Sequence, residues 1–318
     1  MEIVILDSGY ESYSFEKELF EKNGFRLKIF PTYEGVASEK RDFAKNAVGI
    51  LVRHTKINEA FLSEMKNLKA VVRYGVGYDN IDVEACSKHD VKAANVQGYA
   101  NQSVSDHAIA LMFSCTRGMW NTKSQLLKGF GTPPVTDIIE LHDKILGIIG
   151  IGRIGSEFCK KVSPFFHHVL ACDPYKPESH FNQLSAQRVE LNELLERSDV
   201  ISIHCNLTSE TRHLINKKEF IKMNKRPVII NTSRGEVIDE TALLDALNSD
   251  KIHSAGLDVY ENEPITDRQN KLVNHPRAVC TGHYAWYSDK ASLELQRRAA
   301  LNLLNFLRGN PVEDCLNK

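Results

Sequence analysis

Leu146-Gly-Ile-Ile-Gly-Ile-Gly-Arg-Ile-Gly155 combines a short apolar run with three glycines in the spacing G-x-G-x-x-G. The apolar run predicts a buried strand, and Gly150, Gly152 and Gly155 predict a turn from that strand into a helix. Gly150 allows the tight turn, Gly152 lets the backbone approach a pyrophosphate, and Gly155 lets the helix lie close to the sheet. The N–H groups of the first helical turn can then bind phosphate. The spacing therefore predicts a dinucleotide site, although a plain glycine turn would also fit it.

The residues after the glycines support this prediction. Residues 157–162 have a helical pattern, and a second apolar strand at 169–172 ends at Asp173. A carboxylate at that position can accept hydrogen bonds from ribose hydroxyls and would repel the extra phosphate of NADP. NAD is therefore the predicted cofactor. Asp173 could also be a turn residue before Pro174, which would leave its position after the glycines unexplained.

Composition places the chain among ordinary globular proteins. Of its 318 residues, 42% are hydrophobic and 25% are charged, and the length suffices for two domains. The formal net charge of −1 predicts no general attraction to nucleic acid or to an anionic membrane. The chain begins with a strand pattern instead of a basic and apolar leader, and it has no apolar run of membrane-spanning length. We therefore expect a cytoplasmic protein.

The cysteines predict neither a disulfide framework nor a metal site. The seven cysteines are odd in number and include no C-x-x-C pair. They lie mostly within apolar segments, as reduced core thiols do.

Residues 1–98 predict a small α/β domain. Strand patterns occupy residues 3–6, 25–29, 48–52 and 70–72, and helical patterns occupy residues 15–21 and 59–66. The last strand runs into Arg73-Tyr-Gly-Val-Gly-Tyr-Asp-Asn80, a glycine-containing loop at the carboxyl end of a strand, where open parallel sheets bind their ligands. The N–H groups of Val76 and Gly77 could bind a carboxylate there. A plain turn with Arg73 in solvent is the alternative.

Two segments lead from this domain to the glycines. Apolar residues at helical spacing predict a long connecting helix over residues 104–115. Residues 118–144 then break the pattern and include Trp120, Phe130, Pro133 and Pro134. Such a segment covers its apolar groups against a second subunit, or it is a meandering surface loop.

Further apolar strands follow the glycines, at residues 200–203, 228–230, 254–257 and 278–280. Near-continuous apolar runs are typical of parallel strands that are covered on both faces. Polar residues at their carboxyl ends should therefore meet Asp173 at one edge of a sheet. These residues are His204, Arg234, Asp258 and His283. A last helical pattern over 291–307 predicts a closing helix that returns to the first domain.

Arg234, Glu263 and His283 are the predicted catalytic residues. A 2-oxo acid that accepts a hydride develops negative charge on its carbonyl oxygen, so the reaction needs a nearby cation and a proton donor. The guanidinium of Arg234 keeps its charge and matches a carboxylate, and the imidazole of His283 can donate or accept a proton. Glu263 would favour the protonated imidazole. Arg234 could instead pair with Glu236 or Asp239. Glu263 could be only a turn residue, and His283 only a structural group.

Six ordered motifs resemble the D-isomer-specific 2-hydroxyacid dehydrogenases over nearly the whole chain. They are Arg73-x-Gly-x-Gly-x-Asp-Asn-Ile-Asp82, Gly150-Ile-Gly-Arg-Ile-Gly155, His204-x-x-Leu-Thr208, Asn231-Thr-Ser-Arg-Gly235, Gly256-Leu-Asp-Val-Tyr-Glu-Asn-Glu-Pro264 and His283. The resemblance implies an NAD-dependent α/β enzyme that interconverts a 2-oxo acid and a D-2-hydroxy acid. It implies two Rossmann-like or flavodoxin-like parallel-sheet domains with an active-site cleft between them. Residues 1–98 and 289–318 would form the substrate-binding domain, and residues 99–288 the NAD-binding domain, through which a homodimer is joined.

The resemblance also implies roles for single residues. Arg234 would bind the carboxylate and the carbonyl oxygen, with His283 and Glu263 as the general acid–base pair. The implied cofactor-binding residues are Gly150, Gly152, Arg153, Ile154, Gly155, Asp173, His204, Cys205, Thr211, Thr232 and Asp258. The implied substrate-binding residues are Arg73, Val76, Gly77 and Trp286.

His283-Tyr-Ala-Trp-Tyr-Ser288 resembles in particular the C-terminal-binding-protein branch, which has a tryptophan three residues after the histidine. In that branch the indole lines the substrate pocket and favours a bulky or apolar substrate side chain. Asn206 and Gly282 stand where prolines are common in the family, which affects the expected loop shape more than the reaction class. Arg73, with Arg53, could instead select a second anionic group.

Other functions remain open at this point. The main alternative is an NAD(H)-sensing, corepressor-like binding protein, but such a sensor does not need Arg234, Glu263 and His283 together. A dehydrogenase for phosphoglycerate, glyoxylate or hydroxypyruvate is also possible. A phosphite- or formate-type enzyme is less favoured, because no residue marks so small a pocket.

Overall fold

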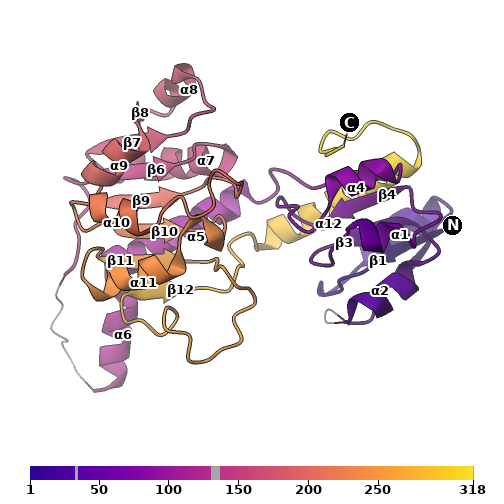
Figure 1. Cartoon of the computed structure of the whole chain (residues 1–318), viewed down its shortest axis with the longest axis horizontal. Helices are drawn as coiled ribbons and strands as arrows, with labels where there is room; N and C mark the ends of the chain where they lie inside the picture. The colour runs from indigo at the N-terminus through magenta and orange to yellow at the C-terminus, as the bar shows by residue number, and fades with distance from the viewer. Residues whose placement is uncertain (33–34, 130–136, 318) are drawn as a thin grey trace. The chain divides into compact units, whose positions relative to one another are not determined.

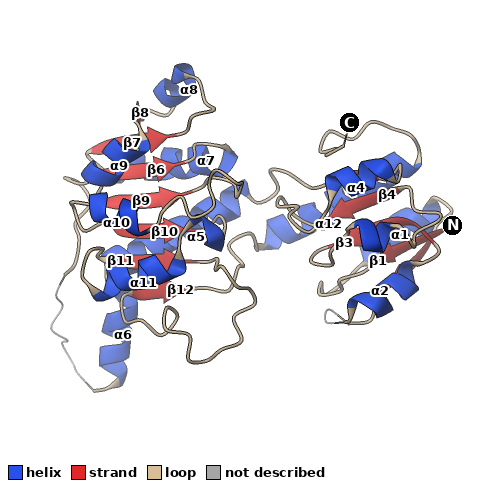
Figure 2. Cartoon of the chain, viewed as in Figure 1, coloured by secondary structure: helices blue, strands red, loops and turns tan. Residues whose placement is uncertain are grey.

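The computed structural model describes residues 1–32, 35–129 and 137–317, which form two compact units. Unit 1 contains Met1–Ala100 and Ser288–Lys318, and unit 2 contains Asn101–Tyr287. Figures 1 and 2 show the elements of both units. The roles expected for the two parts of the chain remain predictions.

Unit 1 is built on a parallel sheet of five strands in the order β2-β1-β3-β4-β5. The strands are β1 (Glu2–Ile5), β2 (Arg26–Ile29), β3 (Ala47–Val52), β4 (Ala70–Arg73) and β5 (Lys92–Ala94). The helices are α1 (Ser14–Lys22), α2 (Ala37–Ala44), α3 (Glu59–Leu62), α4 (Val83–Lys88) and α12 (Asp289–Leu307). The predicted closing helix is thus confirmed as α12. It packs against β3 and β4 through a buried face that includes Leu295, Ala299 and Leu303.

Unit 2 contains a parallel sheet of seven strands in the order β12-β11-β10-β9-β6-β7-β8. The strands are β6 (Ile145–Ile149), β7 (His168–Cys172), β8 (Gln187–Arg188), β9 (Val200–Ile203), β10 (Val228–Asn231), β11 (Ser254–Leu257) and β12 (Ala278–Cys280). The α-helices are α5 (Asn101–Thr116), α6 (Met119–Leu127), α7 (Arg153–Val162), α8 (Glu178–Gln183), α9 (Leu191–Arg197), α10 (Lys217–Lys222) and α11 (Glu240–Asn248), with short 3-10 turns at Ser163–Phe165 and Gly235–Val237. Two parallel sheets with helices confirm the α/β class.

The strand order reverses at β6, which pairs with β7 on one side and β9 on the other. In open parallel sheets, ligands bind outside the carboxyl ends of the strands at such a reversal. The glycines that follow β6 therefore lie at the expected ligand-binding edge of unit 2.

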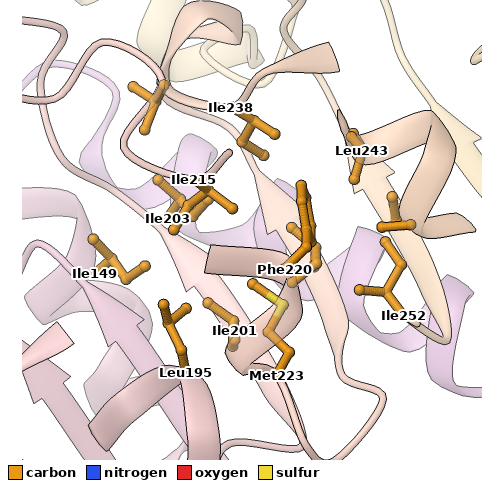
Figure 3. Packing of buried hydrophobic residues seen from close by; sticks show 14 of the residues in the cluster. Ile149, Leu195, Ile201, Ile203, Ile215, Phe220, Met223, Ile238, Leu243 and Ile252 are labelled. Carbon is orange, nitrogen blue, oxygen red and sulfur yellow. The ribbon is translucent and has the colours of Figure 1, made fainter. Parts of the chain in front are cut away.

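Both faces of the sheet in unit 2 bury apolar residues. Along β10, Val228 and Ile230 join one buried cluster, while Ile229 joins the other. This alternation follows from the two-residue period of a strand and explains the near-continuous apolar runs in the sequence. Figure 3 shows the second cluster, in which Phe220 from α10 packs near isoleucines of the sheet.

Two predicted segments differ from the structure. The helix expected over residues 59–66 ends at Leu62, because the N–H groups of Glu64 and Met65 bond to carbonyls three residues earlier and tighten the chain into turns. The pattern-breaking segment after Gly118 contains the helix α6, which begins after Gly118 in a left-handed conformation. Phe130, Pro133 and Pro134 lie outside the described residues. No helix of the described chain combines the length and hydrophobicity needed to cross a membrane.

Candidate active site

The glycine loop after β6 has the geometry that its sequence requires. Gly150 has a φ of +86°, and a Cβ on it would lie 2.8 Å from the backbone nitrogen of Cys205. A Cβ on Gly155 would lie 2.1 Å from the carbonyl oxygen of Gly150, so α7 could not pack this closely with any larger residue. A Cβ on Gly152 would meet no atom within 4 Å in the described structure. The space beside Gly152, before Arg153 and Ile154 in the first turn of α7, is thus open to a phosphate group.

Asp173 lies directly against this loop. Its Oδ2 accepts a hydrogen bond of 3.0 Å from the N–H of Ile151, and its Oδ1 accepts one of 3.0 Å from the N–H of Tyr175. The N–H of Gly150 donates to the carbonyl oxygen of Cys172, one residue earlier. Each carboxylate oxygen retains acceptor capacity for a ribose hydroxyl. The structure therefore brings together the glycines and the carboxylate that the sequence connected.

His204 and Cys205 follow β9 on the other side of the glycine loop. The N–H of His204 donates to the carbonyl oxygen of Ile149, and its ring lies 2.9 Å from Ser202 Oγ and against Phe158. Burial lowers the pKa of His204 well below its usual value, so this ring is neutral at neutral pH. Burial raises the pKa of the Cys205 thiol to about 12. Both residues therefore present neutral groups beside the loop.

Thr211 belongs to the next loop, where its hydroxyl donates to the carbonyl oxygen of Asn206 at 2.6 Å. It also accepts a hydrogen bond of 2.7 Å from the N–H of Thr208. Thr211 thus shapes the loop that contains Asn206, the residue found in place of a proline.

The turn after β10 is held by Asn231. Asn231 Oδ1 accepts hydrogen bonds from the N–H and the hydroxyl of Ser233, and its Nδ2 donates to the carbonyl oxygen of Arg234. A Cβ on the next residue, Gly235, would lie 1.9 Å from the backbone carbon of Tyr260. The missing side chain thus lets the turn that bears Arg234 pack on the segment that leads to Glu263.

The two alternative partners of Arg234 have other contacts. Glu236 forms an ion pair of 2.8 Å with Arg212. Asp239 caps α11, because its carboxylate accepts a hydrogen bond from the N–H of Ala242.

Glu263 and His283 form a hydrogen-bonded pair. His283 Nδ1 lies 2.5 Å from Glu263 Oε2, and Glu263 Oε1 accepts a hydrogen bond of 2.8 Å from the N–H of Tyr260. Burial acts to raise the pKa of Glu263, but its bond to His283, the Tyr260 N–H and the charge of Arg234 lower it further than burial raises it. Glu263 is therefore ionised at neutral pH and suited to orient a charged imidazole.

Asp258 holds the loop that bears His283. The N–H of His283 donates to the carbonyl oxygen of Asp258 at 2.7 Å, and the buried carboxylate accepts bonds from the Thr281 hydroxyl and the N–H groups of Tyr284 and Ala285. These bonds hold His283 at a φ of +55°, a conformation uncommon outside glycine. The sequence placed Asp258 only near the cofactor and missed this role.

Thr232 lies in the same turn as Arg234 and has an unsatisfied hydroxyl. Its side chain is buried, and within the described chain its Oγ1 has no hydrogen-bond partner. Buried polar atoms are normally paired, so a polar group of a bound molecule would satisfy this one. Together with the open space at Gly152, this orphaned hydroxyl fits a bound dinucleotide.

The remaining predicted residues belong to other segments. Arg73 is the last residue of β4 in unit 1, and Val76 and Gly77 lie in the loop that follows it. Arg73 Nε donates to the carbonyl oxygen of Arg53. The carbonyl oxygen of Val76 accepts a hydrogen bond of 2.6 Å from Asn95 Nδ2. Trp286 follows His283 in unit 2 and contacts the ring of Tyr287 edge to face.

Comparison with known proteins identifies the family. The sequence profile described as "D-isomer specific 2-hydroxyacid dehydrogenase, NAD binding domain" matches residues 109–285, more than half of the chain. This chain belongs to the D-isomer-specific 2-hydroxyacid dehydrogenase family. The matched part lies within unit 2 and contains the glycine loop, which confirms NAD as the predicted cofactor.

Curated members of this 2-hydroxyacid dehydrogenase family are similar over most of the chain. A hydroxypyruvate reductase of Thermotoga maritima is 38% identical over 251 residues, which are 79% of this chain and 80% of the relative. A D-3-phosphoglycerate dehydrogenase of Archaeoglobus fulgidus is 33% identical over 302 residues, or 94% of this chain. The chain spans 56% of the length of that archaeal relative.

Solved structures of the family share the fold of the whole chain. A glyoxylate reductase from Paecilomyes thermophila is 29% identical, with a TM-score of 0.89 over 99% of this chain and 98% of the other. The apo-structure of D-lactate dehydrogenase from Escherichia coli is 28% identical, with a TM-score of 0.84 over 99% of this chain and 100% of the other. These 2-hydroxyacid dehydrogenases differ in the substrates that their names state.

Proposed function

We propose that this chain is an NAD-dependent D-2-hydroxyacid dehydrogenase that interconverts a 2-oxo acid and a D-2-hydroxy acid. The observation that carries this proposal is the bonded pair of His283 and Glu263, with the charge of Arg234 close enough to lower the pKa of Glu263. A purely NAD(H)-sensing protein has no need for this arrangement. The relatives described above are also named as dehydrogenases or reductases.

Each residue of this set has a distinct role in the proposed reaction. Arg234 binds the substrate carboxylate and stabilises the charge that develops on the carbonyl oxygen. His283 Nδ1 is engaged with Glu263, so Nε2 exchanges the proton with the substrate oxygen. Glu263 orients the ring and stabilises its charged form. The nicotinamide supplies or accepts the hydride when NAD is bound.

The other predicted residues hold the two reactants. The glycine loop with Arg153 and Ile154 binds the pyrophosphate, and Asp173 binds the ribose. His204, Cys205, Thr211, Thr232 and Asp258 complete the cofactor site in this proposal. In unit 1, the N–H groups of Val76 and Gly77 bind the substrate carboxylate.

A turnover assay tests the reaction class. Purified protein is mixed with NADH or NADPH and a panel of 2-oxo acids with small, bulky apolar and anionic side chains, and cofactor absorbance is followed. We expect oxidation of NADH with at least one acid and a D-configured product. Absence of turnover with every acid, in a protein that binds NADH, would contradict the proposed reaction and favour the sensor.

Replacement of His283 tests the acid–base role. We expect His283→Ala to reduce kcat by about 10²- to 10⁴-fold, because the proton donor is lost, while the Kd for NADH stays within about two-fold. His142→Ala is the matched control, since that histidine has a side chain 75% exposed and forms a surface ion pair with Glu140. Stopped-flow turnover and NADH titration give the two readouts, and an unchanged kcat in the His283 variant would remove it from catalysis.

Two features of the chain point to different substrate side chains. Arg53 follows β3 and Arg73 ends the neighbouring strand β4, directly opposite Val52. Two cations therefore lie at one edge of the sheet of unit 1. They support a substrate with a second anionic group, as in the phosphoglycerate-type enzymes. Trp286 instead supports the bulky or apolar side chain expected from the C-terminal-binding-protein branch.

The kcat/KM values of an Arg53 variant and a Trp286 variant distinguish an anionic substrate side chain from an apolar one. If Arg53 binds a second anion, Arg53→Met lowers kcat/KM for an anionic 2-oxo acid by at least about ten-fold and leaves pyruvate unaffected. If Trp286 determines the preference, Trp286→Ala lowers kcat/KM for a branched apolar 2-oxo acid, and the Arg53 variant does not.

A homodimer joined through unit 2 is also proposed. Met119, Leu126 and Leu127 of α6 are 57%, 55% and 79% exposed, which leaves apolar surface that a second copy could cover. Light scattering after gel filtration should give twice the mass of the chain. The double variant Leu126→Lys/Leu127→Glu should lower that mass, whereas Lys128→Glu, on the same turn, should not.

A cytoplasmic location is supported by the free cysteines, which suit a reducing compartment.

A further inference from the structure

Residue Ile151 of the glycine loop has its peptide groups fixed at both ends. Its N–H donates to Asp173 Oδ2 at 3.0 Å, and its carbonyl oxygen accepts a hydrogen bond of 2.9 Å from the hydroxyl of Ser156 on α7. His180 Nε2, from α8, lies 3.0 Å from the same carbonyl oxygen and 2.9 Å from Ser156 Oγ. The side chain of Ile151 is fully buried in the apolar core. Three different elements therefore determine the position of this one residue, between Gly150 and Gly152.

The partners of His180 indicate which of its ring nitrogens carries a hydrogen. A carbonyl oxygen only accepts hydrogen bonds, so the 3.0 Å distance from Nε2 to the Ile151 oxygen fits the tautomer with a hydrogen on Nε2. The Ser156 hydroxyl has a single hydrogen, which it donates to the same carbonyl, so its oxygen can accept from His180 as well. His180 thus donates to the glycine loop in both its neutral and its charged form.

The segment from Asp173 to His180 contacts the glycine loop at each of its ends. Directly after the second contact, Phe181 anchors α8, because its side chain is fully buried in the same core as Ile151. Both bonds are made at Ile151, whose neighbour Gly152 faces the open space beside the start of α7. A shift of Ile151 would therefore move the backbone that must lie against the pyrophosphate.

We propose that His180 is a positioning residue for the cofactor, which with Ser156 keeps the glycine loop in its binding geometry before NAD arrives. A loop that is already ordered loses less conformational entropy on binding, so its ligand binds more tightly. His180 does not itself touch the reacting atoms. This inference rests on NAD binding by the family and not on the proposed 2-oxo acid reaction.

Binding measurements test this inference without turnover. Titration calorimetry of the purified chain with NADH should give a Kd about ten-fold higher for His180→Ala, because the loop loses a hydrogen-bond donor. ADP-ribose, which keeps the pyrophosphate and lacks the nicotinamide, should lose affinity by the same factor. His180→Gln should restore most of the affinity, since its amide nitrogen can donate from the position of Nε2.

Matched variants separate positioning from folding. His168→Ala removes an exposed histidine from the opposite end of β7 and should leave the Kd unchanged. Ser156→Ala should weaken NADH binding in the same direction as His180→Ala, and it provides a second test if the His180 variant fails to fold. At saturating NADH, kcat should stay within about two-fold, so the change appears in the KM for NADH.

The outcomes that overturn the inference are specific. An unchanged Kd for NADH in folded His180→Ala and Ser156→Ala proteins would show that the loop needs neither donor. Loss of affinity in His180→Ala that His180→Gln fails to restore would also contradict it. Because the readout is binding, the result stands whether or not a 2-oxo acid is turned over.

Discussion

Asp7 illustrates how a single buried carboxylate organises unit 1. It follows β1 and is almost fully buried, and it accepts hydrogen bonds from Lys40 Nζ at 2.7 Å and Thr55 Oγ1 at 2.6 Å. The N–H groups of residues 53–55 also donate to it. Burial acts to raise the pKa of Asp7, but these bonds lower it to about 2. The carboxylate therefore fixes the start of the loop that carries Arg53.

The depressed pKa of Asp7 predicts an acid-dependent loss of stability. A carboxyl group with a lowered folded-state pKa stabilises the fold above its unfolded value of 3.8, and this stabilisation is lost as the pH falls toward 2. The shift corresponds to about 2 kcal/mol at neutral pH. We expect Asp7→Asn to lower the free energy of unfolding of unit 1 by about 2–4 kcal/mol at pH 7.

Urea denaturation at several pH values measures this effect. The difference between the Asp7→Asn variant and the unchanged chain should shrink between pH 4 and pH 2. If the difference in unfolding free energy between the variant and the unchanged chain stays constant over this pH range, ionisation of Asp7 is not its cause.

At the residue scale, sequence reasoning identified the groups that chemistry requires but not those that hold them. Gly150, Asp173 and His283 follow strands with recognisable spacing. In the structure Asp173 accepts a hydrogen bond from the glycine loop at Ile151, and His283 bonds to Glu263. His180 has no such signal, because the hydrogen bond that gives it meaning depends on how the chain folds back after Asp173. One of twelve histidines cannot be singled out without that geometry.

At the scale of elements, substitutions of Gly152 and Gly155 at the start of α7 should have different effects on stability and on NADH binding. Gly155→Ala places a methyl group 2.1 Å from the carbonyl oxygen of Gly150, so it should destabilise unit 2 by about 1–3 kcal/mol. Gly152→Ala meets no atom of the described structure within 4 Å and should cost less than about 1 kcal/mol. Its methyl group should instead obstruct the pyrophosphate and raise the Kd for NADH by more than about ten-fold.

Thermal unfolding and NADH titration of the two variants distinguish these effects. The expected pattern is a lower Tm for Gly155→Ala and weaker NADH binding at nearly unchanged Tm for Gly152→Ala. The same Tm and the same Kd in both variants would contradict the separate roles of the glycines.

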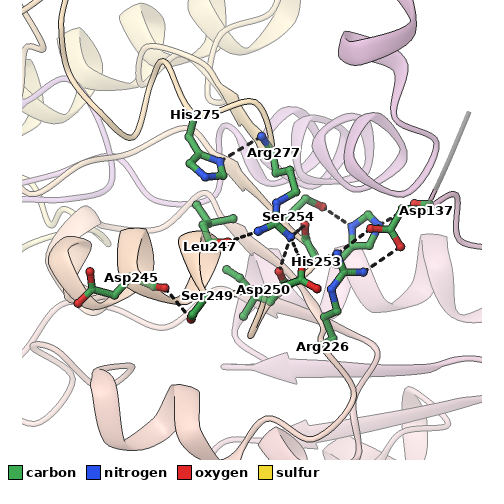
Figure 4. A network of polar contacts seen from close by, with 11 residues as sticks. Asp137, Arg226, Asp245, Leu247, Ser249, Asp250, His253, Ser254, His275 and Arg277 are labelled. Carbon is green, nitrogen blue, oxygen red and sulfur yellow. Dashed lines mark hydrogen bonds and ion pairs between the residues drawn. The ribbon is translucent and has the colours of Figure 1, made fainter. Parts of the chain in front are cut away.

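A polar network joins α11 to the strands at the other edge of the sheet (Figure 4). Arg277, just before β12, donates to the carbonyl oxygens of Leu247, Ile252 and His253 and pairs with Asp250 at 2.5 Å. Arg226 pairs with Asp250 and Asp137, whose side chains are 63% and 49% exposed. Arg277 thus satisfies carbonyls near the end of a helix, while Arg226 mainly pairs exposed charges.

The two arginines should therefore differ in their contribution to stability. We expect Arg277→Met to lower the free energy of unfolding by about 1–3 kcal/mol, since it leaves carbonyl groups without their donor. Arg226→Met should cost no more than about 1 kcal/mol, and that cost should diminish in 1 M salt. Denaturation with urea at low and high salt measures both effects, and a larger, salt-insensitive loss for Arg226→Met would reverse this assignment.

The elements that sequence reasoning found and missed differ in a physical way. Strands buried on both faces, such as β9 and β10, read directly as apolar runs. The short helix α8 and the two-residue strand β8 carry too few apolar residues to show a period. The position of β8 depends on its pairing with β7, and α8 packs against β8. The helix α6 differs from a buried helix, because its apolar residues Met119, Leu126 and Leu127 are exposed.

At the scale of the whole molecule, the division into two units predicts that a ligand stabilises mainly the unit that binds it. NADH bound to unit 2 at 100 times its Kd should stabilise that unit by about 2.7 kcal/mol. Hydrogen exchange should therefore slow by about 100-fold for amides in β9 and β10, and less for amides in β1 and β3 of unit 1. Equal slowing in both sheets would show that the two units unfold as one.

The sequence predicts two parallel-sheet domains, but it does not predict the strand orders of the two sheets. Parallel strands with intervening helices predict the α/β class, and the glycine motif marks the strand beside which the order reverses. The apolar spacing of residues 291–307 predicts a helix, which we interpret as one that returns to the first domain, and α12 packs there. Which face of α12 meets β3 and β4 depends on side-chain fit and required the structure.

Unit 1 is assembled from two separated segments, while unit 2 is one continuous stretch. During synthesis on the ribosome, all of unit 2 emerges before the segment that supplies α12. The apolar face of β3 and β4 that α12 covers is therefore exposed during the time in which unit 2 is synthesised. A chaperone that binds nascent chains should consequently contact residues 47–73 for longer than any strand of unit 2, which crosslinking of stalled ribosome complexes can measure.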